Sequence, residues 1–277
     1  MLEMAIELRE KPLKPFLRWA GGKAWFHQHL VDLLGNHEFD NYYEPFLGGG
    51  SIFFSLNATE AVLSDANAEL IEAYIAVRDH PEEVIETFLT YRNEKDFYYN
   101  LRAQIPDDPN ARAARFIYLN RTSYNGLYRV NRQGQYNVPF GNKPSIGINE
   151  GTIRSASEGL QNAVLVSGDF EDGIEHIREN TLVFLDPPYT VSHNHNGFIA
   201  YNQDIFSIED QQRLANFIHQ IDEVGAYYIL TNAAHDAIRN IFRDCGRSFI
   251  VERQSLIGGR NAQRGLTEEL VFTNIDV

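Results

Sequence analysis

The chain has 277 residues and a hydrophobic fraction of 43%, which is enough for one large domain or for a core domain with an insert. It contains no apolar run long enough to span a membrane, so we expect a cytoplasmic protein with no membrane partner. Its single cysteine, Cys245, excludes an internal disulfide and zinc sites built from several thiolates. The net charge of -14 argues against a nucleic-acid partner unless positive charge is gathered locally.

Short stretches rich in β-branched and aromatic residues are predicted strands: 41–46, 61–64, 163–167, 181–185, 226–231, 248–252 and 269–273. Several are continuous apolar runs, as expected for parallel strands covered on both faces, and helical stretches such as residues 207–224 separate them. The pattern predicts an α/β fold with one sheet of about seven strands. Residues 1–12 are expected to form an extended lead-in.

A long insertion separates the second predicted strand from the third. We predict that residues 67–155 form a second domain, and that residues 1–66 and 156–277 form the core domain. The first part of the insertion has helical spacing, with apolar residues at Leu70, Tyr74 and Val77. Residues 129–138 are predicted to form a β-hairpin that turns at Gly134.

Positive charge is concentrated in this insertion. Residues 111–149 contain no Asp or Glu but include Arg112, Arg115, Arg121, Arg129, Arg132 and Lys143. A solvated arginine face is the usual meaning of such a cluster, but aromatic and amide side chains interleave with these arginines, which favours nucleic acid. A second, weaker cluster comprises Arg239, Arg243, Arg247, Arg253, Arg260 and Arg264.

The first predicted core strand runs into a glycine-rich turn. The sequence Glu-Pro-Phe-Leu-Gly-Gly-Gly-Ser occupies residues 44–51, and a helix is predicted over 52–57. Gly48 and Gly50 let the backbone pass close to a ligand, and Asp65, seventeen positions after Gly48, can accept hydrogen bonds from both hydroxyls of a ribose. The spacing matches neither the dinucleotide fingerprint nor a P-loop. A nucleoside cofactor without a pyrophosphate fits better.

A second motif follows the predicted strand 181–185. Asp186, Pro187, Pro188 and Tyr189 place a carboxylate, two stiff residues and an aromatic ring after a buried strand. The Asp186 carboxylate and the Pro187 carbonyl can both accept hydrogen bonds from an exocyclic amine, and Tyr189 can stack on the attached base. An Asp-Pro turn with a packed tyrosine is the structural alternative, but the preceding cofactor loop favours catalysis.

These motifs together resemble the Dam-type DNA adenine methyltransferases of the α group, or D12 class. The resemblance rests on the sequence motifs at 18–23, 44–50, 65–67, 119–129, 136–141, 168–170 and 186–189, in the family's order, and it covers residues 16–274. It implies a Rossmann-like methyltransferase sheet with an inserted helical DNA-recognition domain that carries the β-hairpin. It further implies transfer of a methyl group from S-adenosylmethionine to the N6 nitrogen of an adenine flipped out of double-stranded DNA.

The resemblance also assigns residues. Those expected around S-adenosylmethionine are Trp19, Lys23, Phe46, Gly48, Gly50, Asp65, Asp169, Phe170 and Asp186. Those expected to bind DNA are Arg18, Arg121, Tyr124, Asn125, Leu127, Arg129, Asn131, Arg132 and Asn137. Arg129 matches the family residue that reads a guanine on the strand opposite the target, and Arg18 lies where the family contacts the guanine before the adenine. GATC is therefore the expected target.

The sequence departs from the family at Arg18, a position that is commonly Lys, and in the loop at 193–197. His193 and His195 lie in that loop without a nearby acid, so we expect no metal. Two alternatives stay open: methylation of an RNA base or a protein amide, and a DNA-binding protein that has lost catalysis. Whether a companion restriction endonuclease accompanies the chain is also open.

Overall fold

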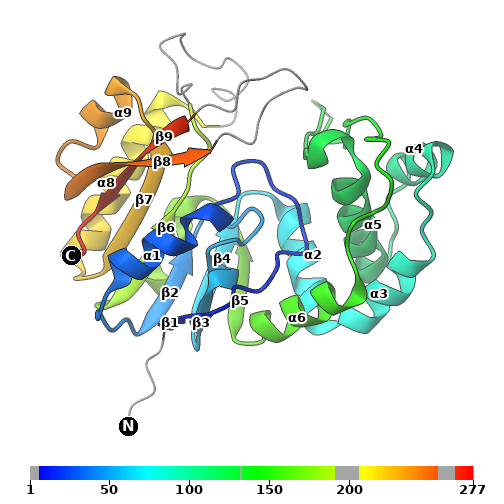
Figure 1. The fold of residues 1–277 in the computed structure, drawn as a ribbon, viewed down its shortest axis with the longest axis horizontal. Helices are drawn as coiled ribbons and strands as arrows, with labels where there is room; N and C mark the ends of the chain where they lie inside the picture. The colour runs from blue at the N-terminus through cyan, green and yellow to red at the C-terminus, as the bar shows by residue number, and fades with distance from the viewer. Residues whose placement is uncertain (1–5, 132, 191–205, 255–265, 277) are drawn as a thin grey trace. The chain divides into compact units, whose positions relative to one another are not determined.

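A computed structural model describes residues 6–131, 133–190, 206–254 and 266–276 (Figure 1). Within these residues seven strands form a sheet in the order β5-β4-β2-β6-β7-β9-β8. The strands are β2 (Asn41–Glu44), β4 (Ala61–Asp65), β5 (Ala163–Ser167), β6 (Thr181–Leu185), β7 (Tyr227–Ala233), β8 (Arg247–Gln254) and β9 (Leu266–Thr273). All seven predicted strands are present, which confirms the predicted α/β fold and its Rossmann-like sheet.

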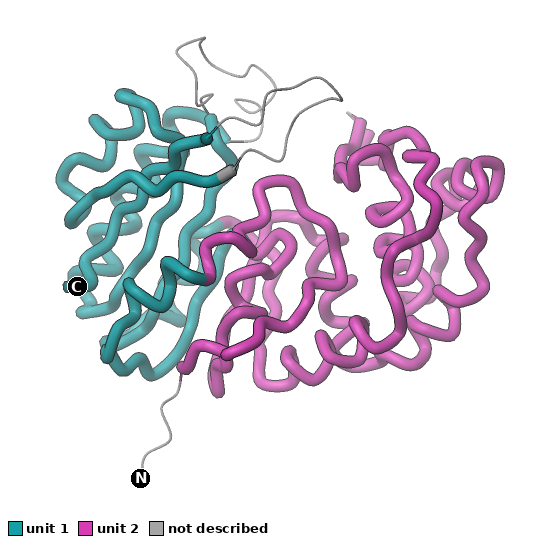
Figure 2. Tube along the Cα trace, in the orientation of Figure 1, with its two compact units in different colours: residues 1–5, 28–46, 170–277 teal, residues 6–27, 47–169 magenta. Residues whose placement is uncertain are grey.

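The described chain divides into two compact units (Figure 2). Unit 1 contains residues 28–46 and the described residues from 170 onward, whereas unit 2 contains residues 6–27 and 47–169. Unit 2 therefore groups β4 and β5 with the helices of the insertion. The predicted inserted domain, residues 67–155, and the predicted core domain, residues 1–66 and 156–277, remain predictions.

Unit 1 is built on the strands β2, β6, β7, β9 and β8. The β2–β6 and β6–β7 pairs are parallel, and the β7–β9 and β8–β9 pairs are antiparallel. Every residue of β6 is buried, as expected for a central strand covered on both faces. The helices of this unit are α1 (His27–Leu34), α8 (Ile208–Glu223) and α9 (Asp236–Ile241), and α8 contacts β7.

Helix α8 confirms the helix predicted over residues 207–224. Ser207 forms a capping box with Asp210, in which each side chain bonds the other residue's backbone N–H. The helix buries Leu214, Phe217 and Ile221 on one face. The cap therefore fixes where the chain enters a helix that supports the sheet.

Unit 2 combines the parallel pair β4–β5 with a group of helices. These are α2 (Ala68–Asp79), α3 (Pro81–Leu89), α4 (Lys95–Ala103), α5 (Pro109–Thr122) and α6 (Glu150–Leu160). Helix α5 contacts α2, α3 and α4, and all its residues from 113 to 122 are buried. The charged residues in that buried stretch consequently need partners inside the protein. Across the described residues, no helix has both the length and the apolar content needed to cross a bilayer.

Two local predictions in unit 2 missed the pairing of one strand. Within the predicted extended lead-in, residues 1–5 lie outside the described residues, and Ile6–Leu8 form the strand β1, which pairs antiparallel with β3 (Leu56–Ala58). The helix predicted over residues 52–57 is only a 3-10 turn, η2 (Phe53–Ser55), because the chain becomes extended at Leu56 to pair with β1. A pairing partner about fifty residues away in sequence overrides the local pattern here.

The predicted β-hairpin is only partly formed. Gly134 makes the turn at a φ of 76°, as predicted, but the flanking strands reduce to the single bridge Val130↔Tyr136. The Asn131 side chain accepts hydrogen bonds from the backbone N–H groups of Gln133 and Gln135, which satisfies the turn without a longer ladder.

The cap of α8 allows a stability test. Ser207→Ala removes the acceptor for the Asp210 N–H and should lower the free energy of unfolding by about 1 kcal/mol. Urea denaturation followed by circular dichroism measures this loss. Ser145→Ala, at an exposed serine outside any cap, is the control and should change little. Equal stability of the two variants would contradict the importance of the cap.

Candidate functional site

The Asp65 carboxylate fastens the glycine-rich turn of unit 2. Its Oδ2 accepts a hydrogen bond from Gly48 N at 2.9 Å, and its Oδ1 accepts one from Asn67 N at 2.9 Å. Burial raises the pKa of Asp65, and these two hydrogen bonds oppose that rise. Asn67 in turn caps α2 through its side chain. One carboxylate at the end of β4 thus holds both the turn and the start of the next helix.

The turn needs glycine because an indole ring lies against it. Gly48 has a φ of 48°, and a Cβ there would lie 2.6 Å from Trp19 Cδ1. A Cβ on Gly50, at a φ of 66°, would lie 2.8 Å from the Tyr74 hydroxyl. Side chains at either position would therefore displace an aromatic residue. Trp19 also stacks on Tyr128, with ring centroids 5.5 Å apart.

The predicted cofactor residues fall into both units. Unit 2 contributes Trp19, Lys23, Gly48, Gly50, Asp65 and Asp169, and unit 1 contributes Phe46, Phe170 and Asp186. Lys23 is buried and donates to the Gly21 carbonyl, whereas Asp169 is exposed after β5. Phe46 and Phe170 lie together, with ring centroids 5.5 Å apart, and the Arg213 guanidinium covers the Phe170 ring at 4.9 Å. Each unit thus assembles part of the predicted set.

The second motif follows β6 in unit 1, where neighbouring strands hold the side chains of Asp186 and Tyr189. Thr231 on β7 donates from Oγ1 to Asp186 Oδ1 at 2.8 Å. The Tyr189 hydroxyl donates to Glu269 Oε2 on β9 at 2.7 Å. Burial, together with the charges of Asp186 and Glu269, raises the pKa of Tyr189 well above its usual range. Tyr189 is therefore a neutral donor at physiological pH.

Pro187 is buried and Pro188 and Tyr189 are half-buried, so the motif forms a stiff segment that reaches the surface.

Sequence reasoning did not identify Thr231 and Glu269. The available signal was an acid at the start of the apolar run 269–273, since a carboxylate in a buried strand needs a partner.

The backbone of Arg18 is clamped by a buried amide. Asn120, which is fully buried in α5, accepts from Arg18 N at 2.8 Å and donates to Arg18 O at 2.6 Å. The Arg18 side chain is exposed and passes Gly126 and Gly147, where added Cβ atoms would lie 3.0 and 3.3 Å from it. Asn120, also absent from the predicted set, therefore sets the position of a predicted DNA contact.

The segment after α5 presents several of the predicted DNA contacts to solvent. Tyr124 is 54% exposed and Leu127 is 39% exposed, and Asn125 between them has a φ of 55°. The exposed Arg129 donates from Nε to Asn137 Oδ1 at 2.7 Å, which holds its guanidinium across the hairpin. Asn131 forms the hairpin turn, whereas Arg132 lies outside the described residues.

Arg121 has a different setting, because it is buried and its donors meet backbone carbonyls. It donates to Phe16 at 2.8 Å and to Pro15 at 3.0 Å, and Lys143 Nζ donates to the Arg121 carbonyl at 2.9 Å. Burial and the charge of Arg18 lower the pKa of Arg121 to about 10. Burial and both arginines lower the pKa of Lys143 to about 8. Arg18, Arg121 and Lys143 form a group that we call the cationic cluster.

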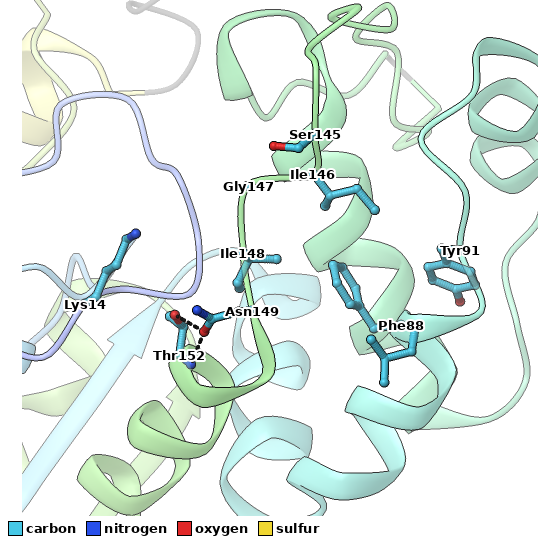
Figure 3. Close-up of a pocket in the computed structure, with 10 residues that line it drawn as sticks. Lys14, Phe88, Tyr91, Ser145, Ile146, Gly147, Ile148, Asn149 and Thr152 are labelled. Atoms are coloured by element: carbon cyan, nitrogen blue, oxygen red, sulfur yellow. Dashed lines mark hydrogen bonds between the residues drawn. The ribbon is translucent and has the colours of Figure 1, made fainter.

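A hollow in unit 2 lies apart from the predicted site residues. A hollow of about 440 Å³ in unit 2 is lined by Lys14, Phe88, Ser145 and their neighbours, and none of the predicted site residues lines it (Figure 3). In the part of the chain that the structure describes, no three His, Cys, Asp or Glu side chains are grouped as a metal site would require. His193 and His195 lie outside the described residues.

Comparison with known proteins identifies the family. Residues 19–256 match the family described as D12 class N6 adenine-specific DNA methyltransferase. The chain belongs to this family. It is thus an enzyme that methylates adenine in DNA, as the resemblance implied.

The relatives of this D12 methyltransferase agree with that assignment. The Type II methyltransferase M1.LlaDCHI of Lactococcus lactis subsp. cremoris is 35% identical over 95% of both chains. The DNA adenine methylase of Salmonella typhi is 30% identical, covering 94% of this chain and 95% of its own. The DNA adenine methylase of Escherichia coli K12 is 32% identical, covering 82% of this chain and 83% of its own.

The lowered pKa of Lys143 predicts how DNA binding changes with pH. Lysine is cationic below its pKa, so the charge of Lys143 is present below about pH 8 and is lost above it. DNA affinity should therefore fall by a few-fold between about pH 7 and about pH 9 at constant salt. Fluorescence anisotropy with a labelled duplex measures the change.

Lys143→Arg is the matched variant, because arginine keeps its charge across this range. Its DNA affinity should fall less with pH than that of the original chain. An equal fall in both proteins would show that Lys143 is not the titrating group.

Proposed function

We propose that this enzyme transfers a methyl group from S-adenosylmethionine to the N6 nitrogen of an adenine that has left the stack of a GATC duplex. One observation carries the proposal: Asp186 follows β6 directly, is held by Thr231, and lies in one short segment with the half-buried Tyr189. S-adenosylmethionine supplies an electrophilic methyl group when bound.

The residues of the glycine-rich turn suit such a cofactor. Each Asp65 oxygen accepts one backbone hydrogen bond and keeps a further lone pair, so the carboxylate suits a pair of ribose hydroxyls. The close packing of Trp19 on Gly48 keeps the turn compact beside that carboxylate. The half-buried Phe46 in unit 1, which packs on the buried Phe170, offers aromatic surface for an adenine ring.

Asp186 and Pro187 act on the adenine amine, which is the nucleophile. In the proposed complex the Asp186 carboxylate and the Pro187 carbonyl accept the two amine hydrogens, which orients the nitrogen lone pair. Thr231 fixes the plane of the carboxylate by occupying Oδ1. The nitrogen becomes cationic on methylation and loses a proton to water, so catalysis needs alignment more than a strong base. An adenine within a duplex must flip to reach Asp186, at a cost of a few kcal/mol.

Two aspartate variants separate catalysis from cofactor binding. Asp186→Ala should abolish methyl transfer while keeping S-adenosylmethionine binding within about tenfold, because its carboxylate acts on the amine. Asp65→Ala should weaken cofactor binding first, since it releases the turn at Gly48. Isothermal titration and tritiated methyl incorporation measure the two effects. Asp107→Ala, at an exposed acid, is the control. Turnover retained by Asp186→Ala would refute its assigned role.

Target specificity is assigned to Arg18 and Arg129. An arginine fork matches the O6 and N7 acceptors of guanine in the major groove. The Arg129 guanidinium is already held by Asn137, and the Arg18 backbone is held by Asn120, so the Arg129 side chain and the point from which the Arg18 side chain extends are ordered before DNA binds. At these two positions the family resemblance implies contacts with guanines on opposite strands. Two such contacts support the palindrome GATC.

Plasmid protection tests this target. A plasmid methylated by the purified enzyme should resist a nuclease that adenine methylation blocks at GATC. Arg129→Ala should lose about 1–3 kcal/mol of binding free energy at GATC and less at altered sites. Arg243→Ala, at an exposed arginine paired with Asp244, should bind like the original chain. Full cleavage with N6-methyladenine found at another sequence would refute GATC but not the methyltransferase assignment.

A further inference from the structure

A carboxylate outside the catalytic motif lies buried beside it. Glu269 on β9 is 1% exposed, a rare state for an acid unless partners compensate its lost hydration. Its Oε2 accepts the Tyr189 hydroxyl, and its Oε1 accepts Arg253 Nε. The buried acid therefore joins a side chain of the catalytic motif to an arginine on β8.

Strand register places this acid beside the residue that holds Asp186. In the β7–β9 ladder Glu269 lies opposite Ala233, and Val271 lies opposite Thr231. Residues two apart on a strand share a face, so Thr231 and Glu269 are diagonal neighbours on one face of the sheet. From this face Thr231 bonds Asp186 and Glu269 bonds Tyr189. Adjacent strands thus hold the two ends of the motif.

Arg253 supplies the charge that the buried acid requires. In the β8–β9 ladder Glu269 lies opposite Val251, and Arg253 stands two residues further along β8. The Arg253 side chain is 17% exposed, so its ion pair with Glu269 is shielded from solvent. In the sequence Arg253 belongs to the second, weaker arginine cluster, but its Nε donates to an internal carboxylate.

The hydrogen bond to Glu269 limits how the Tyr189 ring can turn. A tyrosine held only by packing can adopt more than one rotamer, whereas a hydroxyl bonded to a buried, ion-paired carboxylate has one favoured position. Tyr189 stays a neutral donor because burial and the nearby carboxylates raise its pKa. The ring plane is therefore set before any base arrives.

We propose that Glu269 is a positioning residue for methyl transfer, acting through the Tyr189 hydroxyl to fix the ring on which the target adenine stacks, with Arg253 holding the Glu269 carboxylate in place. The inference rests on the proposed function of Tyr189 as that stacking surface. It differs from a structural role in which Glu269 only ties β8 to β9 through Arg253.

A double-mutant cycle separates the two roles. Tyr189→Phe removes only the hydroxyl, and Glu269→Ala removes its acceptor. Each should lower the single-turnover methylation rate about tenfold, since a hydrogen bond to a charged group is lost, with little change in the KM for S-adenosylmethionine. The double variant should be no slower than the slower single variant, because both changes delete the same interaction. Glu269→Gln keeps an acceptor oxygen and should recover most of the rate.

Fluorescence gives an independent measure of the ring. The fluorescence of 2-aminopurine at the target position rises when this base flips out of the duplex. Stacking on a fixed Tyr189 ring should quench part of that fluorescence. Glu269→Ala should therefore give brighter complexes than the original chain, and Glu269→Gln should not. If Glu269→Ala does not fold, Tyr189→Phe replaces it in both measurements, because it removes the same hydrogen bond and leaves Glu269 paired with Arg253: it should be about tenfold slower and brighter than the original chain.

The outcomes are distinct. If the fold-losses in rate of the two single variants multiply in the double variant, or if neither single variant changes the rate, the positioning role is overturned. Equal 2-aminopurine emission from Glu269→Ala and the original chain would also overturn it. Absence of methylation by the original chain would instead refute the proposed function itself, so the two failures can be told apart.

Discussion

Two backbone hydrogen bonds to the Asp65 carboxylate constrain the part of unit 2 on which the proposed cofactor site depends. Because the carboxylate holds Gly48 N and Asn67 N at once, the glycine-rich turn, the end of β4 and the start of α2 have one relative position. Trp19 packs on this turn, and Tyr128 stacks on Trp19. Their sequence neighbours Arg18 and Arg129 are the proposed guanine contacts, so the proposed cofactor turn and the proposed recognition residues adjoin one set of packed rings.

Unit 1 uses the same principle with side chains in place of backbone groups. The motif after β6 contains two functional side chains, and each receives a hydrogen-bond partner from a different strand. A carboxylate and a ring that are already oriented lose little conformational freedom when an adenine binds. Stiff prolines between them transmit this orientation along the segment. The proposed catalysis by alignment therefore depends on β7 and β9 as much as on the motif.

The parts predicted from sequence are those with a local signature. Short stretches rich in β-branched and aromatic residues located all seven strands, and the Ser207 cap marks the start of the predicted helix that the structure confirms. The errors arise from distant partners: the pairing of β1 with β3 shortened an expected helix to the 3-10 turn η2 and made the chain extended from Leu56. Asn120 and Glu269 were missed because their partners, Arg18 and Tyr189, are 102 and 80 positions away, and no local pattern reports such contacts.

Modified-base sequencing shows whether the motif at Asp186 methylates adenine at N6. DNA is taken from cells that lack adenine methylation and express either the original chain or Asp186→Ala. We expect N6-methyladenine on both strands of GATC with the original chain and none with the variant. Unmodified adenine with both proteins, or equal modification by both, would refute the proposed role of the motif.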